Sequence, residues 1–352
     1  MTSFISNGRL AAIFFSALCL SVSAQTLSYS HDTLFSSGGL SADYWAQQSL
    51  SERPSRVVML DDARLRASAE LAGQMLWLER RLLGEYRGNS NVLALAAKPD
   101  TSIKSGQTSN FPLEGKVRAF EFDALGATLK QSLTSAWTAS LSPQLVFLKN
   151  YTETNGNGSL ITSNSTADAA GQLNRFGMSS YGFSTQEQNL RFDPGWSLDL
   201  STQYKGDHFS FDLSVQNLAS EISTQGLYYS YRDYNVRTQN GTLNLSDTPS
   251  ISGRYGQQNT KLALPKITKL DLSPSAWHGL SVGAFGVEND FVPVLSYRTD
   301  LLLPGAMAQM MGEGNWRLSY SMAWLKTKGS ISVTWAAGLA PIWQINALSL
   351  SF

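Results

Sequence analysis

WRLSYSMAWLKTKGSISVTWAAGLAPIWQINALSLSF, residues 316–352, alternates apolar and polar side chains over three short segments. A period of two places alternate side chains on opposite faces of a β-strand. The apolar faces are Trp316, Leu318, Tyr320, Met322 and Trp324; Ile331, Val333 and Trp335; and Leu348, Leu350 and Phe352. Aromatic residues near the strand ends predict membrane-spanning strands with lipid on one side and a polar lumen on the other. A soluble sheet with one buried face gives the same period.

The amino terminus has the features of an export signal. Arg9 precedes an apolar run from Leu10 to Leu20, and small residues at 22–24 suit a signal peptidase. We therefore expect residues 1–24 to be a signal peptide and the mature chain to start at Gln25. A lipoprotein with its lipid on Cys19 is the alternative, but Ser16 and Leu18 depart from that motif.

Composition excludes several classes of protein. Cys19 is the only cysteine, so a mature chain from Gln25 has no disulfide. No later run of 18 apolar residues exists, which excludes a helical membrane protein, and the mean hydropathy of −0.16 is compatible with a barrel. The formal net charge is zero and 15% of residues are charged, so no basic field favours nucleic acid as a partner.

The segment 25–112 is expected to form an N-terminal periplasmic or plug-like segment. Leu71, Met75, Leu78 and Leu82 have helical spacing, which predicts a helix over 61–83. Its apolar stripe needs cover, so it would plug the barrel, lie on its periplasmic rim or bind an envelope partner; packing within its own chain is favoured. We predict no regular secondary structure for residues 25–54 and a linker over residues 88–110.

From residue 113 to 352 the pattern predicts an all-β domain, a closed antiparallel transmembrane β-barrel of about 12 strands, within a range of 10 to 14. The clearest hairpin runs from Trp196 to Asn217. Expected strands cover 116–123, 133–141, 144–151, 196–204, 208–217, 226–236, 262–272, 279–287, 291–300, 316–324, 330–337 and 343–352, with two more possible at 241–246 and 250–255.

Connection lengths predict the topology. If Phe352 ends on the periplasmic side, the short connections 325–329, 288–290 and 205–207 fall on that side, where barrels have short turns. The stretches 301–315 and 152–194 then become long external loops. The region 237–261 fits this scheme if it contains two further short strands.

These features together resemble Gram-negative outer-membrane β-barrel proteins over residues 114–352. The resemblance implies that the last strand carries the signal for the barrel-assembly machinery: Leu348, Leu350 and Phe352 match its apolar positions, whereas Ile345 and Ala347 stand where that class usually has a polar residue and a glycine. A helix before the barrel is also similar to the hatch of fatty-acid-uptake transporters and to barrels of secretion and conjugation systems. Outer-membrane lipid is the expected solvent.

No catalytic or cofactor site is expected. The three histidines, His31, His208 and His278, provide no metal or nucleotide motif. His208, Ser210 and Asp212 share one strand face, but positions two apart are separated by roughly 6.5 to 7 Å, too far for a direct triad. Outer-membrane phospholipases carry His and Ser at this spacing, but the Asn and Gly expected next are Phe211 and Asp212 here.

The remaining polar and aromatic residues suit a barrel wall. Trp196, Tyr204, Trp316, Trp324, Trp335 and Trp343 are assigned to membrane-interface girdles rather than to a sugar-binding or hydrophobic-ligand track. Asp199, Asp212, Arg298 and Arg317 are the candidate lumen-facing residues, where they would set selectivity or pair across the interior.

Three hypotheses for function follow. The first is a non-enzymatic outer-membrane transporter or channel for a small or hydrophobic solute, with a plug-like N-terminal segment. The second is an outer-membrane scaffold or accessory component of a secretion or surface-assembly system. The third is a secreted soluble β-sandwich binding module. A lipid-modifying barrel enzyme built on His208 and Ser210 is a minor fourth.

Overall fold

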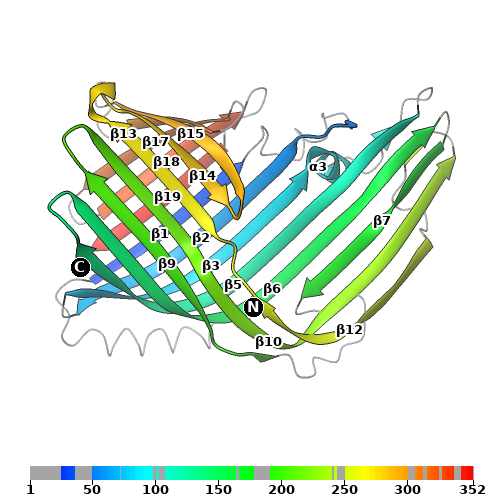
Figure 1. The fold of residues 1–352 in the computed structure, drawn as a ribbon, viewed down its shortest axis with the longest axis horizontal. Helices are drawn as coiled ribbons and strands as arrows, with labels where there is room; N and C mark the ends of the chain where they lie inside the picture. The colour runs from blue at the N-terminus through cyan, green and yellow to red at the C-terminus, as the bar shows by residue number, and fades with distance from the viewer. Residues whose placement is uncertain are drawn as a thin grey trace.

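A computed structural model describes residues 25–35, 50–71, 73–97, 101–102, 108–163, 166–177, 191–239, 242–243, 250–299, 306–311, 315–324, 327–336 and 342–351. These residues are almost entirely β-strand (Figure 1). The expected signal peptide, 1–24, and Phe352 lie outside the described residues. Within the described residues, no helix has the length and apolar character needed to cross a membrane.

The strands of the first half of the chain are the long ones. They are β1 (Gln25–Phe35), β2 (Arg56–Leu71), β3 (Gln74–Asn89), β4 (Thr101–Ser102), β5 (Ser109–Ser132), β6 (Trp137–Ser163), β7 (Thr166–Gly177), β8 (Arg191–Phe192), β9 (Gly195–Lys205) and β10 (Phe209–Gln239). One helix, α3 (Ser90–Ala97), follows β3.

The later strands are mostly shorter. They are β11 (Thr242–Leu243), β12 (Ser250–Leu262), β13 (Ile267–Pro274), β14 (Leu280–Val287), β15 (Asp290–Thr299), β16 (Ala306–Met311), β17 (Asn315–Trp324), β18 (Thr327–Ala336) and β19 (Ile342–Ser351), with a 3-10 turn, η1 (Ser275–Trp277), before β14.

All but β4 and β11 belong to one antiparallel sheet of seventeen strands. We call each position across the sheet a place. β7, β8 and β9 follow one another in the one place between β6 and β10, and β12 and β13 together fill the place after β10. The seventeen strands therefore fill fourteen places. Eleven of these places, from β5 onward, come from the part of the chain for which 10 to 14 strands were expected, and β1, β2 and β3 add three more. β1 pairs with β2 on one edge and with β19 on the other, Leu27 lying opposite Leu350.

The sheet has two parts that differ in length. The basal part comprises β1, β9 and β13–β19 with residues 61–71, 74–84, 119–132, 137–149 and 209–221 of the long strands. The extension comprises residues 85–89, 109–118, 150–163, 222–239, β7 and β12, which run on toward the right of Figure 1. β10, of 31 residues, therefore spans both parts, whereas β14 has only 8 residues.

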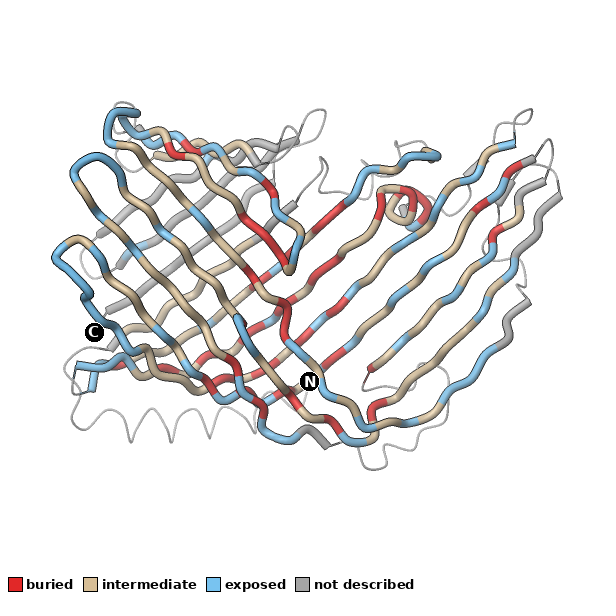
Figure 2. Tube along the Cα trace, viewed as in Figure 1, coloured by how far each residue is buried: buried red, intermediate tan, exposed pale blue. Residues whose placement is uncertain are grey.

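The core lies between the two layers of the sheet that cross in Figure 1. Its buried members include Leu60, Phe122 and Val146 from one layer and Ile222 and Ile267 from the other. Figure 2 places many of the buried residues near this crossing. We call the side of the sheet that carries this core the inner face and the opposite side the outward face. In the extension, the outward face carries a second cluster with Leu95 of α3 and Leu160.

The helix expected over 61–83 is wrong, because these residues form most of the β2–β3 hairpin. The apolar residues at helical spacing come from two strands joined near Gly73, whose φ of 76° suits a glycine in the connection. The charged residues of these strands alternate with apolar ones, and Asp62 and Arg81 are buried on the inner face. The segment 25–112 therefore supplies β1, β2, β3 and the start of β5 to the main sheet.

Several expected connections are also wrong. The stretch 301–315 contains β16, and 152–194 contains the end of β6, β7 and β8. β12 fills part of 237–261 and shares its place in the sheet with β13, so the two further spanning strands are not needed. The connection after β14 consequently lies at the opposite end from the one after β9. Residues 25–35 and 90–97, expected to be irregular, form β1 and α3.

Candidate functional site

Arg81 and Asp62 form the centre of the ionic network on the inner face. The guanidinium of Arg81 donates to both Asp62 oxygens, Nε to Oδ1 at 2.7 Å and Nη2 to Oδ2 at 2.8 Å. The side chains are 1% and 0% exposed. Arg64, two residues along β2 on the same face, donates to the same carboxylate. Paired geometry of this kind offsets the cost of burying charge.

This network reaches the other layer of the sheet. Gln216 of β10 accepts a hydrogen bond from Arg81 Nη2 at 3.1 Å and one from Arg64. Lys269 of β13 lies 2.7 Å from Asp32 of β1, between Nζ and Oδ2. β1 and β13 stand seven places apart among the fourteen. Fourteen strands about 4.8 Å apart would enclose a circle about 21 Å across before tilt. The ion pair between the side chains of Asp32 and Lys269 requires β1 and β13 to lie closer together than this width, so the sheet is flattened here.

A second ionic cluster lies where the basal part meets the extension. Arg118 of β5 donates to Glu85 of β3 and, through Nη2, to Glu288 Oε1 at 3.0 Å. Glu288 stands at the tip of the β14–β15 hairpin with φ 56°, and the adjacent Val287 is fully buried. Asp290 at the same tip pairs with Arg56 of β2 at 2.6 Å. Ion pairs and buried valine together hold this tip against the opposite layer.

The inner face also has a packed aromatic position. Trp77 is 2% exposed, donates from Nε1 to Thr128 at 3.2 Å and lies under the guanidinium of Arg66 at 4.2 Å. A Cβ at Gly126 would lie 2.3 Å from the Trp77 ring. The indole therefore occupies the volume that any side chain at residue 126 would need.

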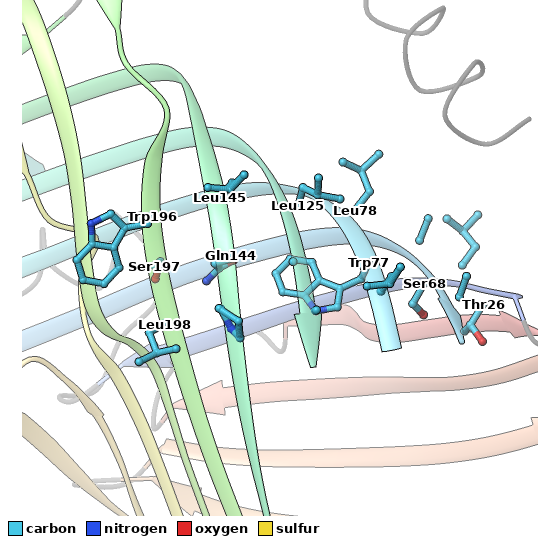
Figure 3. A pocket seen from close by; sticks show the side chains of 17 residues that line it. Thr26, Ser68, Trp77, Leu78, Leu125, Gln144, Leu145, Trp196, Ser197 and Leu198 are labelled. Carbon is cyan, nitrogen blue, oxygen red and sulfur yellow. The ribbon is translucent and has the colours of Figure 1, made fainter. Parts of the chain in front are cut away.

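The outward face of the basal part carries an apolar groove with a volume of about 700 Å³. Figure 3 shows Leu78, Leu125 and Leu145 side by side on neighbouring strands. Leu145 and Trp196 are 50% and 47% exposed. Their neighbours along the strands, Gln144, Val146 and Ser197, are buried on the inner face. The wall consists of Leu27, Ala67, Ala69, Leu76, Leu78, Leu125, Ala127, Pro143, Leu145, Trp196 and Leu198, with Thr26, Ser68, Trp77, Gly126, Gln144 and Ser197 between them.

Charged residues border one end of this groove on the same outward face. Arg80 follows Leu78 by two residues on β3 and pairs with Glu121, and it lies 3.9 Å from Asp123. Lys149 Nζ lies 2.9 Å from Asp123 Oδ2. Their side chains are 29–40% exposed. The groove thus ends in a half-exposed chain of two cationic and two anionic groups, which we call the charged rim.

Two of the four candidate lumen residues have partners on the inner face. Asp199 accepts from the backbone N–H of Asn217 at 2.7 Å and from Gln144 at 3.3 Å. Asp212 accepts from Gln203 at 3.1 Å, within one strand pair. Arg298 is exposed and shares the strand face of the buried Ser296. The side chain of Arg317 lies outside the described residues, and its backbone pairs opposite Gln309 and Thr334.

The aromatic positions follow the strand ends only in part. Trp137, Tyr204 and Phe209 cluster at the end of β9, with ring centroids 5.8 Å apart for the first pair and 4.9 Å for the second. Trp196 stands at the other end of β9 on the same face. The side chains of Trp316, Trp324, Trp335 and Trp343 lie outside the description. Of the six aromatic residues assigned to the girdles, the structure therefore places Tyr204, beside Trp137 and Phe209, at one end of β9 and Trp196 at the other.

The residues considered for catalysis and for the assembly signal take part in hydrogen bonds and strand pairing. Asp212 bonds Gln203, while the backbone carbonyl of His208 accepts from the N–H of Ser275 at 2.9 Å. Leu348 and Leu350 lie in β19 opposite Tyr29 and Leu27 of β1. No group of three or more His, Cys, Asp or Glu residues that could hold a metal ion occurs in the part of the chain that the structure describes.

The groove, the charged rim and the two ionic clusters are not predicted by the sequence pattern. Each combines residues from strands whose register was unknown. The period-two spacing of Asp62, Arg64 and Arg66, and of Glu79 and Arg81, was the available signal for the buried network.

Comparison with known proteins adds no relative. No family model matches the chain, and neither the curated proteins nor the solved structures contain a significant match.

Proposed function

We propose that this protein is an outer-membrane β-barrel that anchors the extension at the cell surface, as a scaffold or accessory component of the envelope. Pairing of β1 with both β2 and β19 supports closure of the basal part into a barrel. Export by residues 1–24, insertion by the barrel-assembly machinery through Leu348, Leu350 and Phe352, and contact with membrane lipid belong to this proposal.

The change of outward residues along single strands supports the membrane position. On β6, Leu141, Leu145 and Phe147 are exposed outward in the basal part. Beyond Lys149, where the register with β5 shifts, Thr152 and Thr154 take that face. A strand whose outward side chains change from apolar to polar at Thr152 and Thr154, before Leu160 packs with Leu95 of α3, suits passage from lipid into water. The β9 segment from Trp196 to Tyr204 covers about 26 Å along the strand, which at a tilt of about 40° spans about 20 Å of the roughly 25 Å apolar band.

Contact between opposite layers is the observation that carries the proposed role. Asp32 touches Lys269, Arg81 touches Gln216, and the β14–β15 tip packs on Arg118. The intervening space holds a continuous cluster of buried apolar residues. A wide aqueous channel needs an open lumen lined by polar groups. An interior filled in this way supports anchoring over free diffusion of a solute, so we rank the scaffold above the channel.

Orientation follows from the resemblance to outer-membrane barrels. β19 ends on the side of the basal part where residues 206–208 join β9 to β10. In that class the chain ends at the periplasmic side and short turns lie there. The extension would then project from the cell surface.

Planar-bilayer recording of the purified full-length chain, together with membrane fractionation, tests this role. We expect heat-modifiable migration on a gel, recovery with the outer membrane, and no conductance above the empty-bilayer level. Glu288→Lys, which places like charge against Arg118, is expected to loosen the seal and give measurable current. Steady conductance by the unaltered chain would refute the anchor.

A gated solute channel is the second candidate, and the β14–β15 hairpin favours it. Its tip is held by two ion pairs, Arg56–Asp290 and Arg118–Glu288, in which Arg56 is 66% and Glu288 is 29% exposed, so breaking both pairs would be the step that frees it. A Cys pair at Arg56 and Asp290, joined by a short bismaleimide, would lock it. Loss of hydrophobic-solute uptake on locking would favour the gated channel. Unchanged uptake would remove it.

A further inference from the structure

The second edge of β12 is a feature of the extension that the proposed anchor does not use. β12 pairs along one edge with β10, from Ser250 opposite Asn235 to Leu262 opposite Ile222. β13, which follows in the chain, pairs with β10 and β14 instead, and none of the described strands pairs with the other edge of β12. β12 lies at the lower right margin of the extension in Figure 1. Backbone N–H and C=O groups of alternate residues point outward along such an edge.

This edge has few of the features that commonly protect a sheet margin. Proteins use short strands, prolines, bulges or a covering element for that purpose. β12 has 13 residues and no proline, and its register with β10 is unbroken from Ser250 to Gln258, about 27 Å. The start of β2, beside residues 85–89 at the opposite margin, is by contrast held by the β14–β15 tip through Arg56 and Asp290. The edge of β12 therefore offers a template for a further strand.

The charges of β12 indicate the chemistry of that strand. Arg254 and Lys261 are its charged residues, and it has no acidic residue. Lys261 pairs with Glu221 of β10 at 2.8 Å. Arg254 is exposed and lies over the ring of Tyr231 at 5.3 Å, and within the described ranges no carboxylate pairs with it. An acidic side chain opposite Arg254 on an added strand would complete a cross-strand ion pair.

A second copy in the same membrane does not fit this edge. Self-pairing of two β12 strands about a twofold axis is antiparallel, so the two strands run in opposite directions. Copies anchored in one membrane project their extensions on the same side, and their β12 strands therefore run in the same sense along the membrane normal. The partner that fits is a different polypeptide.

We infer that the second edge of β12 binds an extended segment of another polypeptide by β-strand addition, with an acidic side chain opposite Arg254. The inference deepens the scaffold role and rests on the proposed projection of the extension from the cell surface. In this mode of recognition, backbone hydrogen bonds supply the affinity and side chains at alternate positions supply the selectivity. The ion pair with Arg254 is the selective contact here.

Binding of a synthetic strand to the full-length chain in nanodiscs tests the inference. The probe is a fluorescent nine-residue peptide of alternating threonine and valine in which glutamate replaces the central threonine. With its centre opposite Arg254, its ends lie opposite Ser250 and Gln258. We expect a saturable rise in fluorescence anisotropy. N-methylation of two consecutive central residues blocks both edges of the peptide and is expected to weaken binding at least about tenfold, from the loss of about two backbone hydrogen bonds.

Two variants and one control locate the bound strand. Arg254→Gln is expected to weaken binding of the glutamate peptide about threefold and to leave binding of a peptide with central glutamine unchanged. Peptides with a cysteine at one end or the other are used for disulfide trapping, and one of them is expected to react with Gln258→Cys on β12. Neither is expected to react with Asn155→Cys, an exposed position on β6 that has a paired strand on both sides.

Several results would overturn the inference and leave the anchor standing. They are absence of saturable binding, equal binding of the N-methylated peptide, equal affinity for glutamate and glutamine peptides, and trapping at Asn155→Cys. Disulfide-linked dimers of Gln258→Cys in native membranes would assign the edge to a second copy and would also overturn it. Release of the chain from membranes by an alkaline wash would instead refute the membrane position.

Discussion

Replacing Gly126 by alanine tests how tightly the inner face of the basal part is packed. The new Cβ would lie 2.3 Å from Cζ2 of Trp77, where a normal carbon contact is about 3.5–4.0 Å. The indole cannot easily retreat, because it is 2% exposed, bonded to Thr128 and covered by Arg66. Overpacking of this kind costs about 1–3 kcal/mol.

An effect of alanine on the unfolded state partly offsets this cost in stability. Alanine reduces the conformational freedom of the unfolded state and by itself stabilises the folded state by about 0.4–1 kcal/mol. The expected net change for Gly126→Ala is therefore a loss of about 1–2 kcal/mol. Gly84→Ala is the matched control on β3, because its Cβ would meet only the backbone oxygen of Asp61 at 3.9 Å. We expect that variant to equal or slightly exceed the unaltered protein.

Urea titration in detergent micelles, followed by the gel shift between folded and heat-unfolded forms, measures both variants. Trp77→Leu provides the second test, since a smaller side chain leaves room for the methyl group. The double variant Trp77→Leu with Gly126→Ala is expected to be more stable than the sum of the single effects by at least about 1 kcal/mol. The packing argument fails if Gly126→Ala is as stable as Gly84→Ala, or if the two changes are additive.

Three further predictions concern the second ionic cluster, alkaline stability and orientation. Arg118→Met leaves the carboxylate of Glu85 buried without its main partner and should destabilise the fold by about 3 kcal/mol in the same urea titration, with partial recovery on adding Glu85→Gln. Burial raises the pKa of Tyr86 above its ordinary value of 10.0, so its contribution to stability is complete below pH 10 and falls as pH rises toward the higher folded-state pKa; urea titrations at pH 8 and 11 should show this fall, and Tyr86→Phe should reduce it. A membrane-impermeant maleimide should label Asn157→Cys but not Asp207→Cys on intact cells, and the reverse result would invert the proposed orientation.

Alternation of side chains was sufficient to predict the β class and many of the strands. The expected 196–217 hairpin is present as β9 and the start of β10, with Ser197 buried and Trp196 exposed as the period requires. The strand expected at 316–324 corresponds to β17. These strands could be recognised because their two faces differ in polarity at every step.

The β2–β3 hairpin was missed because polarity alone does not show which face a charge occupies. Leu71, Met75, Leu78 and Leu82 have helical spacing by coincidence across a turn at Gly73. The environment of the charged residues on these strands depends on contacts with Gln216 of β10, which is far away in sequence, and no local rule predicts such a contact.

Strand length was misjudged for a different physical reason. Residues 133–141 and 144–151 were expected to be separate strands, yet both fall largely in β6, which runs through Pro143. The register with β5 shifts beside Lys149, where Glu121 pairs with Asn150 and Phe122 with Leu148. An extra residue in one strand reverses the alternation beyond it. A sequence pattern broken in this way looks like a strand end.

The shift at Lys149 also joins fold and proposed function. Without an extra residue, the side chains beyond it would exchange faces, and Tyr151, now 2% exposed beside Phe120 with ring centroids 4.9 Å apart, would point outward. The same extra residue brings Lys149 to Asp123 on the outward face. One local irregularity thus keeps the inner core continuous from the basal part into the extension and completes the charged rim. The change on β6 from outward Leu145 and Phe147 to outward Thr152 and Thr154 is therefore set by the backbone register as well as by the choice of side chains.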